Sequence, residues 1–198
     1  MGARAIIEWH QTDSGTPAFL QRNHWLSPST FLPALADFVH AARQTGQVPD
    51  AGLFQSWAAD HAPHVLGEEE TGERTALVLP TSDIQFHYLV QLTGTGGPAE
   101  RTLIVTARER EVLLPGARGH WTVLAQAGTD AELHEEAAAL LEGQAARIRS
   151  LAAQGRGGPM PPPDEVANRA RLIRARAGLR ATQCEAVPQG GVSPDKGK

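Results

Sequence analysis

The first candidate site is the polar stretch QRNHWLSPST at residues 21–30, which precedes an apolar periodic run. It joins a cation, an imidazole, an indole and two hydroxyl groups: Arg22, His24, Trp25, Ser29 and Thr30. A helix that starts here directs free backbone N–H groups and the positive end of its dipole outward, which favours an anionic ligand. The plain alternative is that the hydroxyls cap the helix and the indole packs on the core.

His87 is the second candidate, because it lies on the polar side of the stretch IQFHYLVQL at residues 84–92. An imidazole there can contact a ligand or act as a general base. The alternative is an ordinary surface histidine. If the strand that carries His87 pairs with the strand that ends near His24, the two imidazoles meet. That arrangement would favour a hydrolase that uses His24 or His87.

Other patterns of catalysis or metal binding are weak. Asp60, His61 and His64 have the spacing of one helical turn, but Pro63 interrupts the helix and no second pair of ligands follows. The sequence has no nucleophile elbow, phosphate loop or dinucleotide fingerprint, and its single cysteine excludes a multi-cysteine zinc site. We therefore assign no catalytic residue, no metal and no cofactor, and an enzyme is not favoured.

Charge divides the chain into an acidic body and a basic tail. Residues 1–142 hold 8 Arg against 18 Asp and Glu, whereas residues 143–198 hold 10 Arg and Lys against 4 acids. Five arginines fall in one short segment: Arg169, Arg171, Arg174, Arg176 and Arg180. Such a segment can bind nucleic-acid phosphate. Alternatively, it packs on the acidic body of the same chain or of a second copy, or remains a solvated tail.

These residues need a scaffold, and the clearest part of it is a strand. Within 84–92, Ile84, Phe86, Tyr88, Val90 and Leu92 fall on one face and polar residues on the other. This alternation is typical of an antiparallel strand with one side on the core and the other open. Further strands are predicted at 3–9 and 17–23, which form a hairpin, and at 102–107, 111–114 and 120–125.

Helices are predicted between and after the strands. Apolar residues recur at helical spacing in 31–42 and 51–66, with Pro63 ending or kinking the second run. Pro33 favours a start near residue 30, capped by Ser29 or Thr30, because proline is tolerated in a first turn. Two more helices are predicted at 130–153, capped by Asp130, and at 164–180, capped by Asp164 and ending near Gly178.

The sequence therefore predicts an α+β fold, with a mainly antiparallel sheet of four to six strands and helices packed on one face. We divide it into an α+β core at 1–127, a C-terminal helix at 128–154, and a Pro- and Gly-rich linker with a basic, partly disordered tail at 155–198. No apolar run approaches the roughly 20 residues that span a bilayer, and the N-terminal residues lack a secretory pattern. A cytoplasmic location without membrane contact is expected.

A resemblance adds to this description. The pieces Ala3-Arg4-Ala5, His24-Trp25 with Pro28, LADFV at 35–39 and FHYLV at 86–90 occur in an order that resembles small α+β proteins of phages and mobile elements. Those proteins carry a Asp-Gly-Tyr-Pro turn where this chain has Leu-Ser-Pro. The resemblance covers roughly residues 1–107. It implies a compact α+β fold and a mobile-element origin, and the family has no established common activity.

Three functions stay open at this point. The first is a non-enzymatic accessory or inhibitor protein that binds a macromolecule or a small anionic ligand through the open sheet face and the 22–30 turn. The second is a nucleic-acid-associated protein that acts through its basic tail. The third is a hydrolase of an unrecognised kind. A second copy of the chain remains among the candidate partners.

Overall fold

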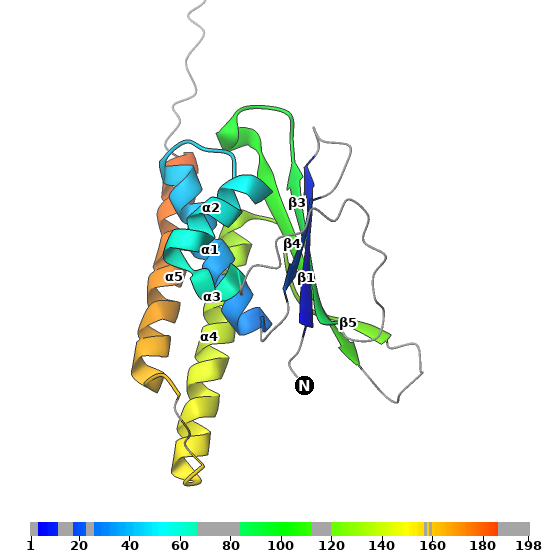
Figure 1. Ribbon diagram of the computed structural model, residues 1–198. Coiled ribbons are helices and arrows are strands. Elements are labelled where there is room, and N and C mark those ends of the chain that lie inside the picture. Colours follow the sequence, from blue (N-terminus) through cyan, green and yellow to red (C-terminus); the bar gives the residue numbers. More distant parts are fainter. Residues whose placement is uncertain are drawn as a thin grey trace, which may run out of the picture.

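A sheet lies on one side of the molecule and a layer of helices on the other (Figure 1). The computed structural model describes residues 4–11, 18–22, 26–66, 84–111, 120–156, 158 and 160–185. The strands in these ranges are β1 (Arg4–Gln11), β2 (Ala18–Arg22), β3 (Ile84–Thr93), β4 (Thr102–Glu111) and β5 (His120–Ala127). The helices are α1 (Pro28–Gln44), α2 (Ala51–His61), α3 (Pro63–Leu66), α4 (Asp130–Ala153) and α5 (Pro163–Glu185), with a 3₁₀ turn at Pro98–Glu100.

The five described strands form one sheet in the order β2-β1-β3-β4-β5. Strands β1 and β2 pair antiparallel, as do β3 and β4 and then β4 and β5. Strands β1 and β3 pair in parallel, with β2 and the helices α1 to α3 between them in the sequence. The predicted α+β fold and the helix cover on one face are confirmed, but the sheet is mixed. The predicted strand at 111–114 lies outside the described residues apart from Glu111, which ends β4.

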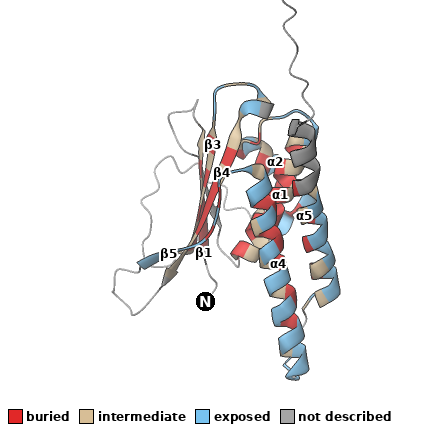
Figure 2. Ribbon diagram, turned by 180° about the vertical axis from the view of Figure 1, so that it is seen from behind, coloured by how far each residue is buried: buried red, intermediate tan, exposed pale blue. Residues whose placement is uncertain are grey.

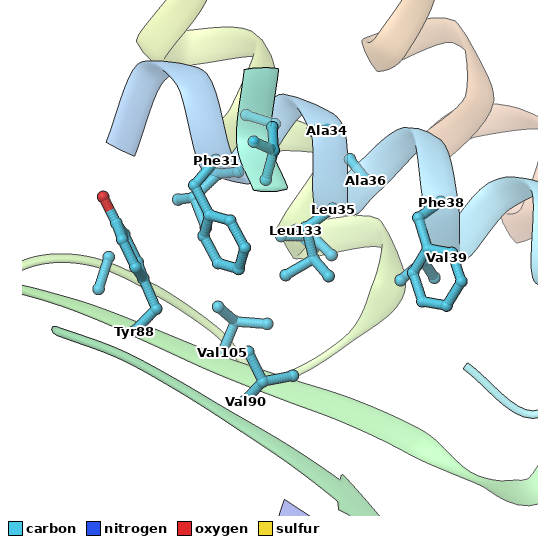
Figure 3. Packing of buried hydrophobic residues seen from close by; sticks show 14 of the residues in the cluster. Phe31, Ala34, Leu35, Ala36, Phe38, Val39, Tyr88, Val90, Val105 and Leu133 are labelled. Atoms are coloured by element: carbon cyan, nitrogen blue, oxygen red, sulfur yellow. The ribbon is translucent and has the colours of Figure 1, made fainter. Parts of the chain in front are cut away.

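Alternation along β3 divides the sheet into two faces, as predicted. Phe86, Tyr88, Val90 and Leu92 are all buried, whereas the residues between them are half-buried. The side chains of Phe31, Leu35 and Val39 on α1 face this buried row (Figure 3). Burial of each large apolar side chain stabilises the fold by about 1.5–3 kcal/mol. The α1–sheet contact is therefore the centre of the core.

Helix α1 begins earlier than the sequence predicts. Its N-cap is Ser27 and Pro28 is its first residue, so Pro33 lies inside the helix and not in the first turn. The Ser27 carbonyl accepts hydrogen bonds from the Thr30 and Phe31 N–H groups at 2.9 Å, which closes the first turn. Pro28 fits the first helical position because its missing N–H has no partner there. Burial of both prolines offsets the backbone hydrogen bond that Pro33 removes.

The other predicted helix boundaries are confirmed in part. Helix α2 ends at His61, and Pro63 starts the short α3. Helix α4 covers the predicted 130–153, but its N-cap is Thr129, whose Oγ1 accepts the Glu132 N–H at 3.1 Å. The side chain of Glu132 in turn accepts the Gly128 N–H at 2.6 Å. This reciprocal pairing resembles a capping box and replaces the predicted cap at Asp130.

Helix α5 packs along α4 and belongs to the same hydrophobic core. Val166, Ala170, Ile173 and Ala177 are buried along one side of it, and Figure 1 shows the two helices side by side. The helix continues to Glu185, so the predicted end near Gly178 is wrong. A single glycine costs only about 1 kcal/mol inside a helix, which is too little to end one that is packed elsewhere. None of the described helices is long and apolar enough to cross a membrane.

Candidate functional site on the helix-free face of the sheet

The face of the sheet that points away from the described helices carries most of the polar chemistry of the strands. We call it the helix-free face. The side chains of this face alternate along β1, β3 and β4 with the buried side chains of the other face. By strand register, the residues on this face include Glu8, His10, His87, Arg108, Arg110, Trp121 and Val123. Part of this face is shielded, because Ile6 on β1 is only 1% exposed. Thr106 on β4 is also buried, at 8% exposure, whereas Trp121 and Val123 are 37% and 52% exposed.

Glu8 on β1 joins two histidines into one cluster. Its Oε1 lies 2.6 Å from Nε2 of His10, and its Oε2 lies 2.8 Å from Nε2 of His87. Partial burial raises the pKa of Glu8, but the hydrogen bonds and positive charge of the two histidines outweigh burial, and the pKa falls below its ordinary value. The carboxylate is thus ionised and only accepts, so each imidazole donates its Nε2–H.

The parallel pairing of β1 and β3 builds this cluster. Ile6 lies opposite His87 and Glu8 lies opposite Leu89, which places the Glu8 carboxylate diagonally across from the imidazole. On the other side of β3, the ring of His87 meets the ring of Trp121 edge-on, with the ring centres 5.8 Å apart. His87 is therefore held between a carboxylate and an indole. A fixed imidazole of this kind can donate to a ligand, or act as a base through Nδ1.

The β4–β5 corner is the second part of the face. We define it as Arg108 and Arg110 on β4 with Trp121, Val123 and Leu124 on β5. Cross-strand pairing places Arg108 opposite Val123 and Arg110 opposite Trp121. Trp121, Val123 and Leu124 are 37%, 52% and 42% exposed, and Figure 2 shows β5 as an exposed strand that extends away from the helices.

The two arginines of the corner have no ion pair with any residue that the structure describes. Glu8, an acidic side chain of the same face, is already engaged by His10 and His87. A β-bulge at Leu124 interrupts the register after Ala107, so β5 pairs regularly in two pieces, residues 120–123 and residues 125–127. Among the described residues, the corner therefore combines two arginines that have no ion pair with exposed apolar surface.

The residues predicted in the 21–30 stretch do not join this surface where they are described. Ser29 and Thr30 lie in the first turn of α1, where both hydroxyls contact the Ser27 hydroxyl at 3.0 and 3.1 Å. That turn lies on the helix side of the sheet, opposite to His87, because the Phe31 ring packs against the buried ring of Tyr88. His24 and Trp25 lie outside the described residues, as does the side chain of Arg22 at the end of β2.

The Asp60-His61-His64 pattern forms no common site. His61 ends α2, where its Nδ1 lies 2.9 Å from the Trp57 carbonyl and its ring stacks on the Trp57 ring. His64 belongs to the separate α3, beyond the break at Ala62. No group of three or more His, Cys, Asp or Glu side chains that could hold a metal ion occurs among the residues described in the structure.

The basic segment of the sequence is mostly paired within the chain. Arg169 and Arg176 on α5 both bind Asp37 on α1, the first at 3.1 Å. Arg174 binds Glu135 at 2.8 Å and also binds Glu142 on α4. Its hydrogen bonds lower the pKa of the Glu142 carboxyl.

The other two arginines of the segment differ from these three. Arg171 is exposed and has no ion pair with the described residues, whereas the side chain of Arg180 lies outside them.

Sequence reasoning found His87 but missed its partners. Glu8 and His10 sit in a strand whose alternation, AIIEWHQ, was visible, yet nothing local shows that this strand pairs with β3. The RER run at 108–110 also alternates, and would have pointed to two arginines on one face had the strand been extended to Glu111. No known family model matches the sequence, and no curated protein or solved structure was found to resemble it.

Proposed function

We propose that the protein is a non-enzymatic binding protein of accessory or inhibitor type, and that its partner is a protein that docks on the helix-free face at the β4–β5 corner. One observation carries the proposal: Trp121, Val123 and Leu124 are exposed within four residues of an edge strand. Contiguous apolar surface of this kind marks interaction sites in proteins. We also propose that the protein comes from a phage or mobile element, and this part rests on the resemblance of residues 1–107 to small α+β proteins of that origin.

The contacts around Trp121 indicate that the exposed apolar surface of the corner is preorganised for binding. Single exposed apolar residues are common, as Leu172 on α5 illustrates at 62% exposure. At the corner, in contrast, Trp121 is braced by His87, which Glu8 holds in place. Tryptophan and arginine are the residue types that most often dominate the binding energy at interfaces. Here the ring of Trp121 is restricted, and Arg110 lies across the strand pair from it.

A displayed library of random peptides selected on the intact protein tests this proposal. Selected peptides should bind the double variant Trp121→Ser/Val123→Thr at least about tenfold more weakly than the original chain, because both substitutions remove the apolar surface. Leu172→Ser is the matched control, since it removes an exposed apolar side chain from α5. It should change the dissociation constants by less than about twofold. Equal binding to the original chain and the β5 variant would exclude this corner as the docking surface.

A hydrolase is the second candidate, because His87 is oriented by the Glu8 carboxylate as general bases are. In that case Glu8→Gln and His87→Gln should each abolish turnover of activated ester substrates, while His10→Gln should lower it less. Turnover that survives His87→Gln would rule this candidate out. The binding proposal is preferred because the Glu8 carboxylate is shared between two histidines, and docking of a partner on the sheet face does not require a cleft.

Nucleic-acid binding through the tail has weaker support. Arg169, Arg174 and Arg176 already bind acidic residues of the body, so releasing them for phosphate would break contacts within the chain. Deleting α5 is a poor test, because it would remove Ala170 and Ile173 from the core. Arg171→Gln should weaken salt-dependent retention on single-stranded DNA if the tail binds it. Unchanged retention by Arg171→Gln would argue against the tail.

A further inference from the structure

We infer that the partner at the β4–β5 corner is an extended acidic peptide segment that adds to the outer edge of β5 as a further strand of the sheet. This inference rests on the proposed function and specifies its partner class. It follows from three features of β5 and its neighbour: an edge that no described strand covers, two arginines without an ion pair to any described residue, and a surface that disfavours pairing with a second copy.

No described strand pairs with the outer edge of β5. β5 is the last strand of the described sheet, and β4 is its one described neighbour. An edge strand presents backbone N–H and C=O groups in alternation, and an extended peptide can pair with them. Natural edges are usually protected by proline, lysine or other charged residues, yet HWTVLAQA at 120–127 contains none of these besides His120.

The bulge at Leu124 sets the length of the docking segment. A bulge disrupts the regular hydrogen-bonding pattern of a strand and thus limits strand addition. Residues 120–123 lie before it, and they pair with residues 108–111 of β4, of which Arg108 and Arg110 lie on the helix-free face. Four residues of regular edge suit a short linear segment of a partner better than a broad sheet-to-sheet contact.

Charge selects the chemistry of that segment. Arg108 and Arg110 lie across from Val123 and Trp121 on the helix-free face, and they have no ion pair within the described part of the chain. An added strand would lie about 10 Å from β4, two strand spacings away. An arginine and a glutamate side chain together span that distance over Val123 or Trp121. Acidic residues at alternate positions of the peptide would therefore meet the two guanidinium groups.

A second copy of this chain fits the same edge less well. Two β5 strands paired about a twofold axis would bring two sets of Arg108 and Arg110 toward one interface. Strand β5 carries no aspartate or glutamate to neutralise them. Like charges at an interface oppose association. Single-stranded nucleic acid supplies negative charge and bases that could stack on Trp121, but it has no peptide backbone to pair with the edge of β5.

The test uses synthetic ten-residue peptides in which glutamate alternates with valine, titrated into the intact protein by calorimetry. The matched control peptide replaces every glutamate with lysine. We expect the acidic peptide to bind at least about tenfold more tightly than the lysine peptide. The variant Arg108→Gln/Arg110→Gln should erase most of that difference while leaving the thermal unfolding midpoint unchanged.

Backbone methylation distinguishes strand addition from simple adsorption to the face. In an added strand, alternate N–H groups point at β5 and the others point away. N-methylation of one alternate set of residues should weaken binding at least about tenfold, whereas methylation of the other set should change it less than about threefold. A bound peptide without strand pairing would show the same response to both sets.

Several outcomes would overturn the inference. Equal affinity for glutamate and lysine peptides would remove the charge argument, and equal effects of both methylation sets would remove strand addition. A concentration-dependent dimer in sedimentation that the Trp121→Ser/Val123→Thr variant abolishes would assign the edge to a second copy. Competition by a poly-dT oligonucleotide at equal or lower concentration would assign it to nucleic acid.

Failure here is separable from failure of the proposed function. If library-selected peptides depend on Trp121 and Val123 but respond equally to both methylation sets, the corner binds a partner without strand addition. If no selected peptide depends on these residues, the docking surface itself is wrong.

Discussion

Arginines occupy two regions of this acidic protein, and the two regions use them differently. On α5, Arg169, Arg174 and Arg176 bind carboxylates of α1 and α4, above an apolar row that is buried in the core. At the β4–β5 corner, Arg108 and Arg110 have no such partners within the described residues, and the apolar side chains beside them are exposed. A cluster of arginines in a sequence therefore does not by itself predict a binding surface, because acidic residues of the same chain can already bind those arginines.

The largest expected effect tests whether apolar packing holds α5 in place. Ile173→Ala should lower the free energy of unfolding by about 2–4 kcal/mol, because Ile173 is 1% exposed and the substitution leaves a cavity between α4 and α5. Urea denaturation measures the loss. Leu172→Ala, one residue away and exposed, should change it by less than about 0.5 kcal/mol. Similar losses for both variants would contradict the packing of α5 described above.

The buried side of β3 gives the next largest effect. Tyr88 is the single tyrosine of the chain, and its hydroxyl donates to the Leu26 carbonyl at 2.6 Å. Tyr88→Phe should cost about 1–2 kcal/mol, since it leaves that carbonyl buried without its donor.

Its titration offers an independent check. Burial raises the pKa of Tyr88, and the negative charge of Glu109 raises it further. Above pH 10 the phenol ionises in the unfolded chain but not in the folded one, so stability falls as the pH rises. Absorbance at 295 nm should therefore change only together with unfolding measured by circular dichroism. A tyrosine that titrates near pH 10 in the folded protein would refute the buried position.

Glu8→Gln gives a smaller effect. Glu8 lies on the helix-free face as Arg108 and Arg110 do, but unlike them it binds other residues of the chain, His10 and His87. Glu8→Gln should lower the free energy of unfolding by about 1 kcal/mol at pH 7, because the hydrogen bonds to His10 and His87 lose their charge. The pKa of Glu8 is depressed below its ordinary value of 4.5 in the folded protein. Its contribution is thus present above pH 4.5 and disappears as the pH falls through the folded-state pKa.

Denaturation curves of the Glu8→Gln variant and the original chain should converge in acid as a result. Asp60→Asn serves as the control, since Asp60 is exposed on α2. It should leave stability nearly unchanged at every pH. A difference between Glu8→Gln and the original chain that persists undiminished at pH 3 would contradict the Glu8–histidine cluster.

The smallest expected effect compares the two sets of arginines directly. Arg169→Gln/Arg176→Gln should cost about 0.5–1 kcal/mol, and less in 1 M salt, because both side chains bind Asp37 at a partly exposed site. Arg108→Gln/Arg110→Gln should change stability by less than about 0.5 kcal/mol at any salt concentration. Equal salt-dependent losses would mean that the corner arginines are also engaged within the chain.

Local patterns predicted the elements of this fold better than their boundaries. The break at Pro63 and the span 130–153 follow from residues inside the elements, and both are confirmed. The start of α1 and the end of α5 were wrong, because burial against the sheet and against α4 outweighs the local costs of Pro33 and Gly178. Tertiary packing commonly overrides such small local preferences.

The candidate site was predictable only in part. The alternation around His87 places this histidine on the polar side of β3, and this placement does not depend on which strands pair with β3. Its partner Glu8 is 79 residues away in sequence, and Trp121 lies on the separate predicted strand 120–125. Neither pairing leaves a local trace in the residues.

By itself, the sequence determined which side of each strand is apolar, because side chains alternate along a strand and the apolar side chains must be buried. It also determined that arginines would cluster near the C-terminus. The tertiary structure alone decided that β1 lies parallel to β3, so that Glu8 meets His87, and that the arginines of α5 find acids while those of β4 do not. The reason is that strand register and helix docking are chosen by the combined packing of distant segments, and no single segment contains that information.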